Sequence, residues 1–170
     1  KLEKGDQIGF RAPVDTLPHM EDRALRPEFA PKPVYTLRVV LGPQDDAFTD
    51  AGIDTFLSGT YTVTPEFDRM GCRLDGPAIA HKDGGDIISD GIAFGAIQVP
   101  SAGTPIIMLA DRQTTGGYTK IANVITADFR ILAQLKTGDK VQFVETPVEY
   151  AQSLLLAQRS ALKALSKINN

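Results

Sequence analysis

Short segments rich in β-branched residues recur about every ten residues from position 60 onward, and this rhythm limits the fold more than any other feature of the chain. Each segment is bounded by Gly, Pro or Asp, the residues that end strands and form turns. The segments read TYTVT, RMGCRLDG, DIISDG, GAIQVP and PIIMLA. Regular spacing of this kind is typical of β-sandwiches and β-barrels. We therefore predict a mainly β fold.

Two further patterns refine this prediction. Residues 34–41, VYTLRVVL, alternate apolar side chains with a more polar face, which indicates an earlier half-buried strand. Residues 100–105, PSAGTP, form a tight connection between two apolar strands. A hairpin is the simplest geometry for that connection, and it predicts that Gln98 lies near Ile106.

Short helices are predicted before and after the strand-rich region. Asp45 or Asp46 can cap a short helix that runs through Phe48. A second helix is predicted to start at Thr49–Asp50 and to stop at Gly59. Near the other end, TADFRILAQL has a Thr/Asp start and helical apolar spacing, which predicts one more short helix.

The carboxy-terminal segment predicts a helix of about 20 residues. Thr146 and Glu149 have the spacing of a capping box, and Pro147 suits the first helical position. The apolar stripe consists of Ala151, Leu154, Leu155, Leu162 and Leu165. Because capping contributes only about 1 kcal/mol, burial of the leucines must stabilise the helix. The stripe packs either on its own barrel, which we favour, or on another chain.

The first 33 residues have a different character. KLEKGDQIGF, residues 1–10, resembles KTGDKVQF at 136–143, since both place Gly-Asp before an alternating strand that ends in Phe. Chance similarity of two turn signals explains this echo equally well on pattern alone. Prolines then interrupt residues 11–33. We expect a final strand of a missing amino-terminal half (1–10), a linker (11–33), a barrel (34–145) and a helix (146–170).

Charge and cysteine content narrow the classes of function. The formal net charge is -3 and no Lys/Arg run exceeds a pair, so neither nucleic acid nor an anionic membrane surface is an expected partner. Cys72 is the only cysteine, so no internal disulfide is possible. No apolar run approaches the roughly 20 residues that span a bilayer, and the first residues lack the apolar stretch of a signal peptide. We expect a cytoplasmic protein.

Familiar catalytic patterns are missing from the sequence. His19 and His81 lack metal-ligand spacing, so we predict no metal site and interpret both as solvated loop residues. Cys72 lies in an expected strand, where a small buried hydrophobe is more typical than a nucleophile. The serines lie outside any nucleophile elbow. The glycine pairs at 84–85 and 116–117 do not match a phosphate-cradling loop.

Two polar clusters beside glycines are the candidate site. In DRMGCRL, strand alternation predicts that Arg69, Gly71 and Arg73 share a face, where two guanidinium groups can clamp a carboxylate. A structural ion pair with Asp68 is the alternative. The second cluster, DRQTTGGYTKIANVI at 111–125, can form a nest of backbone N–H groups for an anion or simply a complicated turn.

Four motifs carry a resemblance to a known family. GPQDDAF, DRMGCRL, SDGIAFGAIQVPSAGTPI and DRQTTGGYTKIANVI resemble the C-terminal half of the family that contains the C-subunit of 5-oxoprolinase, also called KipI antagonist KipA or allophanate hydrolase subunit 2. The resemblance runs from Lys1 to about Val144 and implies a cyclophilin-like β-barrel, like part of the carboxyltransferase domain of urea amidolyase. Family chains are about twice as long, which favours a missing first half.

The resemblance also implies a function. Proteins like this one act with a sister B-subunit (KipI-like) and a separate A-subunit in the ATP-dependent opening of 5-oxoproline to L-glutamate, so we expect a component that is inactive alone. Relatives in urea amidolyase transfer a carboxyl group from biotin to urea, and others are regulatory binding proteins that antagonise a kinase inhibitor; both remain alternatives. In each enzymatic case the substrate is a small polar amide, ATP is used by the complex, and biotin enters only in the carboxyltransferase alternative.

The implied site joins residues 68–73 with 111–118. Asp68, Arg69 and Asp111 are the expected catalytic residues. The expected substrate-binding residues are Arg73, Gln98, Arg112, Gln113, Thr114, Thr115 and Tyr118. Relatives commonly have Ser directly before the Asp-Arg-Met-Gly motif, whereas Phe67 stands here, so a role for that hydroxyl is not carried over.

Overall fold

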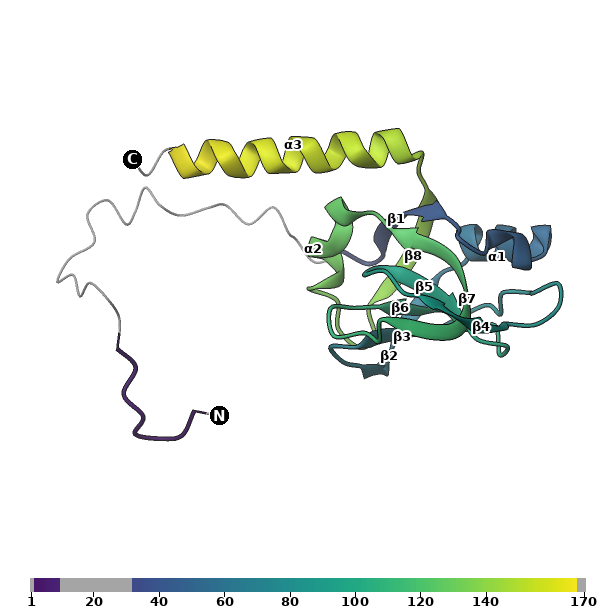
Figure 1. Cartoon of the computed structure of the whole chain (residues 1–170), viewed down its shortest axis with the longest axis horizontal. Coiled ribbons are helices and arrows are strands. Elements are labelled where there is room, and N and C mark those ends of the chain that lie inside the picture. The colour runs from purple at the N-terminus through teal and green to yellow at the C-terminus, as the bar shows by residue number, and fades with distance from the viewer. Residues whose placement is uncertain (1, 10–31, 168–170) are drawn as a thin grey trace. The chain divides into compact units, whose positions relative to one another are not determined.

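The computed structural model describes residues 2–9 and 32–167, which fall into two compact units divided after Pro31 (Figure 1). In the first unit, residues 2–9 form an exposed turn. Its hydrogen bonds run from the Glu3 N–H to Asp6 Oδ2 (2.8 Å) and from the Asp6 N–H to the Glu3 carbonyl (3.2 Å). Residues 2–9 contain no strand, so the expected final strand stays a prediction. The expected linker at 11–33 lies almost wholly outside the described residues.

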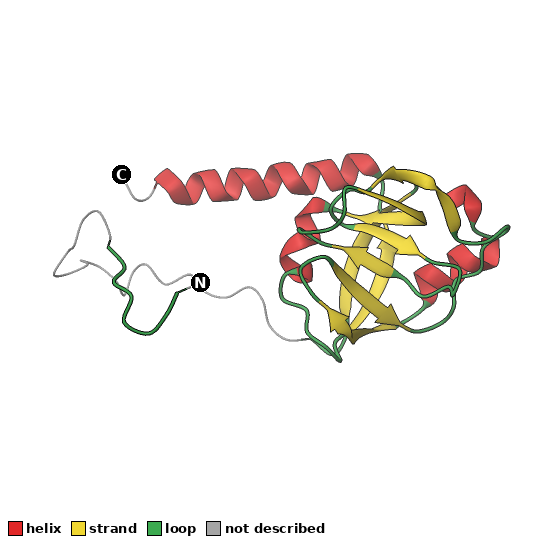
Figure 2. Cartoon of the chain, turned by 60° about the horizontal axis from the view of Figure 1, so that its bottom comes forward, coloured by secondary structure: helices red, strands yellow, loops and turns green. Residues whose placement is uncertain are grey.

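The second unit is a closed β-barrel, as Figure 2 shows. Neighbouring strands follow the order β1-β8-β2-β3-β6-β5-β7, and β7 pairs back to β1 to close the ring, while β4 pairs with β7 outside it. The β1–β8 pair is parallel and all other pairs are antiparallel. Among the described residues the strands are β1 (Tyr35–Leu41), β2 (Tyr61–Phe67), β3 (Gly71–Asp75), β4 (Asp86–Gly91), β5 (Ala96–Val99), β6 (Ile106–Met108), β7 (Thr115–Val124) and β8 (Lys140–Glu145).

The strand alternation seen in the sequence fills the barrel core. Along β1, Tyr35, Leu37 and Val39 are buried and the residues between them are not. Such alternation is what a sheet with one apolar face requires. The predicted hairpin is also present, because Gln98 in β5 pairs directly with Ile106 in β6. The mainly β barrel with short helices and a carboxy-terminal helix is therefore confirmed.

Short helices lie where the sequence predicts them, but only α1 has its predicted cap: Asp45 and Asp46 lie inside η2, whose N-cap is Gln44 without a side-chain cap, and the helix ends before Phe48. Helix α1 (Asp50–Ser58) starts at Thr49, whose side-chain oxygen accepts from the Gly52 N–H (2.9 Å), and ends at Gly59, as predicted. Its Phe56 ring stacks on Phe143 of β8 with centroids 4.5 Å apart. The other predicted short helices are η2 (Asp45–Ala47), η3 (Thr126–Asp128) and α2 (Phe129–Leu132).

A buried ion pair joins η3 to the barrel. Asp128 Oδ2 accepts from the Arg38 backbone N–H and from Arg38 Nε, both at 2.9 Å, and Asp128 Oδ1 pairs with Arg38 Nη2. Asp128 is fully buried, whereas the Arg38 side chain is partly exposed. The hydrogen bonds raise the pKa of the Arg38 guanidinium, and the opposing effect of burial is smaller. Asp128 therefore holds η3 against β1 through three hydrogen bonds, all donated by Arg38.

The carboxy-terminal helix α3 (Val148–Lys167) is present, but its predicted cap and its packing differ from expectation (Figure 1). The Thr146 N–H donates to the Val39 carbonyl (2.8 Å), so it is not available to Glu149 as a capping box requires. Among residues 148–164 no side chain is buried. The favoured packing of the stripe on its own barrel is therefore confirmed only in part: Ala151, Leu154 and Leu155 are half-buried where α3 contacts η3, whereas Leu162 is 62% exposed.

Truncating α3 tests this arrangement. Deleting residues 157–170 should change the free energy of unfolding by less than about 1 kcal/mol, because residues 157–164 bury no side chain against the barrel. Urea denaturation followed by circular dichroism measures the effect. Leu132→Ala is the control, since it truncates a fully buried side chain and should cost about 2–5 kcal/mol. A comparable loss in the truncated chain would mean that the helix does pack on the barrel.

Candidate functional site

The two polar clusters found in the sequence lie side by side. The Asp111 N–H donates to the Arg69 carbonyl (2.9 Å), and the Leu109 N–H donates to the Met70 carbonyl (2.9 Å). Arg69 Nη2 also lies 2.9 Å from Asp111 Oδ2. The Arg69 side chain is 85% exposed, so most of its donors face solvent although Asp111 holds one of them. The β2–β3 turn and the loop after β6 therefore present an exposed guanidinium.

Arg69 and Arg73 do not share a strand face, contrary to the prediction. Arg69 lies in the turn before β3, where Asp68 Oδ1 accepts from the N–H groups of Met70 (2.8 Å) and Gly71 (3.0 Å). Asp68 therefore shapes the turn instead of pairing with an arginine. Arg73, inside β3, pairs with Glu66 of β2 at 2.6 Å between Nε and Oε2. The turn interrupts the alternation on which the prediction relied.

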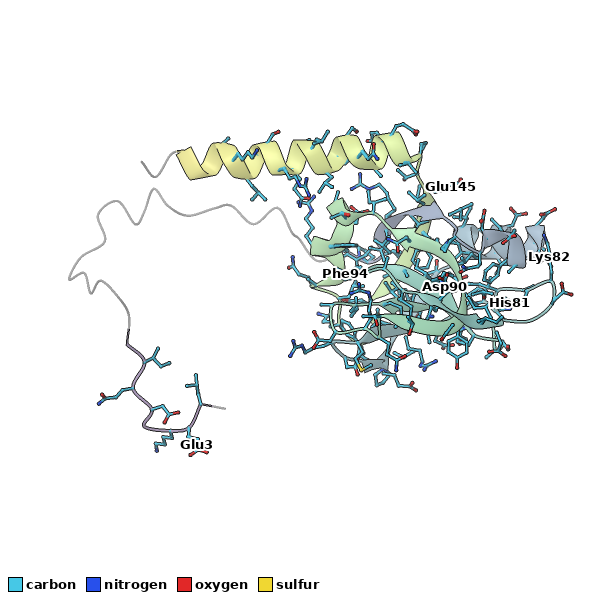
Figure 3. All side chains as sticks on the ribbon, in the orientation of Figure 1. Glu3, His81, Lys82, Asp90, Phe94 and Glu145 are labelled. Atoms are coloured by element: carbon cyan, nitrogen blue, oxygen red, sulfur yellow. The ribbon has the colours of Figure 1, made fainter. Side chains whose placement is uncertain are left out.

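Arg112 is held by backbone carbonyls and does not join Arg69. Its Nε donates to the Ile92 carbonyl (3.0 Å), and its Nη1 lies 3.3 Å and 3.4 Å from the carbonyls of Leu109 and Ala110. The guanidinium carbon is also 5.9 Å from the centre of the Phe94 ring, which Figure 3 labels. Arg112 thus connects the loop after β6 to the loop after β4.

The run after Arg112 is mostly a strand. Thr115 already begins β7 and pairs with Gly91 of β4, so the glycine pair lies in a ladder and forms no anion nest. Thr114 accepts from the Ile92 N–H (2.9 Å) through its carbonyl. The side chains of Gln113, Thr114 and Thr115 are exposed, and Tyr118 is 41% exposed. Four of the predicted binding residues therefore border solvent, Thr114 and Thr115 beside Gly91 and Ile92, and Tyr118 opposite Asp86.

A second group of polar side chains is buried in the middle of the sheet. Gln98 of β5 pairs directly with Lys120 of β7, so their side chains leave the same face of the sheet. Gln98 is 4% exposed and Lys120 is 1% exposed. Neither Gln98 Nε2 nor Lys120 Nζ has a hydrogen-bond partner. A buried amide nitrogen without a hydrogen-bond partner, as at Gln98, is unusual because an unpaired buried polar group is costly.

Asp90 and Gln44 complete this second group. Lys120 Nζ lies 3.3 Å from Asp90 Oδ2, which is within ion-pair distance although the geometry is not that of a hydrogen bond. Gln44 bridges the two residues, since its Nε2 donates to Asp90 Oδ2 (3.1 Å) and its Oε1 accepts from the Lys120 N–H (3.1 Å). The hydrogen bond from the Gly91 N–H, aided by Lys120 and Gln44, holds the pKa of Asp90 below its usual value.

Sequence reasoning identified Gln98 in this group and missed Lys120, Asp90 and Gln44. The missed signal is the alternation Gly116, Tyr118, Lys120, which places three residues on one face once the run is interpreted as a strand. The polar composition of the run instead favoured a loop. Gln44 was not identifiable from pattern, because it meets Lys120 across 76 positions of sequence.

The histidine and cysteine predictions have different outcomes. His81 is not a solvated loop residue, because its Nε2 lies 3.0 Å from the Val99 carbonyl and 3.1 Å from Thr119 Oγ1, and its ring packs on Phe48. His19 lies outside the described residues. Cys72 is fully buried, and burial raises the pKa of its thiol to about 12, as suits a packing residue.

Neither a metal cluster nor a membrane span occurs in the part of the chain that the structure describes. In residues 2–9 and 32–167, no group of three or more His, Cys, Asp or Glu side chains is placed to hold a metal ion. Over the same residues, no helix has the length and apolarity needed to cross a bilayer.

The chain is similar to known proteins over most of its length. Residues 1–145 match the family described as carboxyltransferase domain, subdomain A and B. The chain is 38% identical over 143 residues to the 5-oxoprolinase C-subunit of Haemophilus influenzae, covering 82% of this chain and 46% of that relative. The Escherichia coli 5-oxoprolinase C-subunit is 36% identical over 115 residues, covering 68% and 37%. The chain thus spans less than half of the length of these two relatives.

The fold has a solved counterpart. The crystal structure of the K. lactis urea amidolyase superposes with a TM-score of 0.74 at 27% identity, covering 79% of this chain and 9% of that chain. The same barrel therefore occurs within a much longer polypeptide.

Proposed function

We propose that this chain, which belongs to the carboxyltransferase domain, subdomain A and B, family, is a component of an ATP-dependent 5-oxoprolinase. The observation that carries the proposal is the 38% identity to a 5-oxoprolinase C-subunit over 143 residues, a span that includes most of the barrel. The A- and B-subunits would be its partners, and the reaction would open the lactam of 5-oxoproline to give L-glutamate. Because the chain spans 46% of that relative, we assign it substrate binding within a larger assembly.

Substrate recognition would begin at the exposed guanidinium of Arg69. The carboxylate of 5-oxoproline matches the paired donors of a guanidinium, and Asp111 holds that group in place from one side. Asp68 would keep the turn in the shape that presents Arg69. Gln113 and Thr114 lie in the same loop as Asp111 and Thr115 follows it, so these three would contact the rest of the substrate, whereas Tyr118 lies further along β7 opposite Asp86. Arg73 and Arg112 already have protein partners, so we assign them supporting roles.

Neither glycine pair of the described residues has the geometry of an ATP phosphate loop. Gly116 and Gly117 lie in the β7 ladder, and the Gly84–Gly85 pair precedes a strand and not a helix, so neither pair forms a phosphate cradle at a helix start. We therefore derive no step through ATP on this chain. The contribution of its own residues is binding and orientation.

Substituting Arg69 tests the proposal. In the complex reconstituted with the A- and B-subunits, Arg69→Ala should lower kcat/KM for 5-oxoproline by about 10-fold or more, because a hydrogen bond to a charged group is lost. Arg159→Ala, an exposed arginine on α3, is the matched control and should keep wild-type kinetics. Co-purification of the three polypeptides shows that assembly survives. Unchanged kinetics in Arg69→Ala would reject this residue as a substrate contact.

Biotin-dependent carboxyl transfer to urea is the second candidate, favoured by the TM-score of 0.74 to the K. lactis urea amidolyase. It predicts that the chain co-purifies with a biotinylated partner that is visible on a streptavidin blot, and that the complex consumes urea and bicarbonate. A complex that turns over 5-oxoproline without any biotinylated component would exclude it. A complex that assembles and turns over neither substrate would point to the regulatory alternative.

A further inference from the structure

Among the described residues, the hydrogen bonds of the Arg112 guanidinium go only to backbone carbonyls. Its Nε donates to the Ile92 carbonyl (3.0 Å), and its Nη1 lies 3.3 Å and 3.4 Å from the carbonyls of Leu109 and Ala110. The residue is half-buried, and no carboxylate of the described residues is paired with it. A rigid, planar guanidinium suits several fixed acceptors better than a lysine ammonium does. These three contacts, here called the Arg112 clamp, join loop 109–114 to loop 92–95.

The clamped loop contains the partner of Arg69. Asp111 directly precedes Arg112. Its N–H donates to the Arg69 carbonyl (2.9 Å), and its Oδ2 lies 2.9 Å from Arg69 Nη2. The Arg69 side chain is 85% exposed, and ordering such a side chain when a ligand binds costs entropy. A contact that orders the side chain in advance lowers this cost, so the position of Asp111 determines how well Arg69 is preorganised.

Phe94 connects the other end of the clamp to the barrel. The centre of its ring lies 5.9 Å from the guanidinium carbon of Arg112. The same ring stacks on Phe129, the first residue of α2, with centroids 4.0 Å apart. The N–H of Gly95 donates to the carbonyl of Met108, the last residue of β6 (2.8 Å). Arg112 therefore holds the exposed loop against regular elements of the fold.

We propose that Arg112 is a positioning residue, which holds Asp111 where its carboxylate orients Arg69 and which does not contact the substrate itself. The substrate carboxylate would bind the donors of Arg69 that Asp111 leaves free. This inference rests on the proposed function for the role of Arg69 as a substrate contact. It deepens that function by replacing the direct role expected for Arg112 from the sequence with a role that acts through Asp111.

A direct role for Arg112 would need donors that the loop already uses. Both Nε and Nη1 are directed at backbone carbonyls, and the Phe94 ring lies beside the guanidinium. A substrate carboxylate that drew the group away would leave these carbonyls without their charged donor, and such a loss is costly. The exposed guanidinium of Arg69 can bind a carboxylate at no such cost.

The side-chain dynamics of Arg69 in the full isolated chain test the proposal. Arg112→Lys should lower the NMR order parameter of Arg69 Nε–H to about its value in Asp111→Ala, because lysine lacks the planar fork of donors. Arg73 Nε–H is the internal control, since its partner Glu66 lies outside the clamp. Adding Arg112→Lys to Asp111→Ala should not lower the Arg69 order parameter further. An unchanged Arg69 order parameter in folded Arg112→Lys would overturn the proposal.

Kinetics of the reconstituted complex separate positioning from direct contact. Arg112→Lys should raise KM for 5-oxoproline about 3- to 10-fold and leave kcat within about 2-fold, because binding is weakened and the reacting atoms are not touched. In the Arg69→Ala background the same substitution should not change KM further, because residues that act through one contact are not additive. Arg159→Lys, on the exposed part of α3, is the matched control and should keep wild-type constants. An equal rise in KM in both backgrounds would show that Arg112 binds the substrate itself, and would overturn the proposal.

The positioning role and the proposed function can fail separately. If the wild-type complex does not turn over 5-oxoproline, the function is rejected, and the order parameters of the isolated chain still decide whether Arg112 positions Arg69. If Arg69→Ala lowers kcat/KM while Arg112→Lys changes neither KM nor the order of Arg69, the function stands and the positioning role is rejected.

Discussion

Replacing Asp128 by alanine should lower the free energy of unfolding by about 3–5 kcal/mol, the range expected when one partner of a buried ion pair is removed. Asp128 is fully buried and accepts three hydrogen bonds, all from Arg38. Its loss leaves the Arg38 backbone N–H without this acceptor and opens a cavity between η3 and β1. Urea denaturation monitored by circular dichroism gives the free energy.

The matched control for this variant is Asp54→Ala. Asp54 is an exposed carboxylate on α1, so its removal should change the free energy of unfolding by less than about 0.5 kcal/mol. Arg38→Met combined with Asp128→Leu should recover part of the loss, since an apolar pair removes both charges together. A loss below about 1 kcal/mol for Asp128→Ala would show that η3 is held by packing alone.

Alkaline pH should remove several kcal/mol of stability, and buried Cys72 is the main cause. Burial raises the pKa of the Cys72 thiol from 9.0 to about 12, and it raises the pKa of Tyr61 from 10.0 to about 12. Both groups are neutral when protonated, so between these values the unfolded chain ionises and the folded chain does not. The associated stability is fully present below about pH 9 and is lost as the pH rises toward 12. The expected loss from Cys72 is roughly 3 kcal/mol by about pH 11.

Cys72→Ala isolates this contribution. The variant loses packing at every pH, but the fall in its free energy of unfolding between about pH 8 and 11 should be smaller than that of the wild type by roughly 3 kcal/mol. Far-UV circular dichroism is the suitable probe, because it does not depend on tyrosine ionisation. Adding Tyr61→Phe should make the fall in the free energy of unfolding over this pH range smaller by about a further 1 kcal/mol. Parallel profiles for the wild type and Cys72→Ala would show that the thiol is not shielded as the fold implies.

Signals that act over a few residues predicted most of the fold. Thr49 caps α1 through the Gly52 N–H only three positions away, and Gly59 ends the same helix. The tight PSAGTP connection predicted a hairpin with Gln98 near Ile106, and the two residues are direct partners in the β5–β6 ladder. In these cases the energetics are local, so composition and spacing contain the needed information.

Predictions failed where the deciding contact comes from distant sequence. The Thr146 N–H was assigned to Glu149, but the Val39 carbonyl on the neighbouring strand takes it. Arg112 was expected to face a ligand, but the Ile92 carbonyl, 20 positions away, accepts from it. A third failure has a local cause, because Asp68 accepts from the N–H groups of Met70 and Gly71 two and three positions away, and the resulting turn places Arg69 outside β3. Each failure reflects a backbone group that competed successfully for a side chain or an N–H.

Half of the candidate site could not be recognised in the sequence, because its residues meet only when distant strands pair. Gln98 and Lys120 look like ordinary polar residues until β5 and β7 are paired. Only then do the buried Gln98 amide and the ion pair of Lys120 with Asp90 come together. Burial of unsatisfied groups is a property of the assembled sheet, and no window of sequence encodes it.

The parallel pairing of β1 with β8 determines how the barrel would respond to mechanical tension. The chain enters β1 at Tyr35, beside Val141, and leaves β8 at Glu145, beside Val39, so the two ends exit in opposite directions along one ladder. A force that pulls them apart would therefore slide β1 along β8 and load all the hydrogen bonds of that ladder at once, instead of opening them one by one. Because a ladder loaded in shear resists extension, the barrel would transmit force between the segment before β1 and the segment after β8.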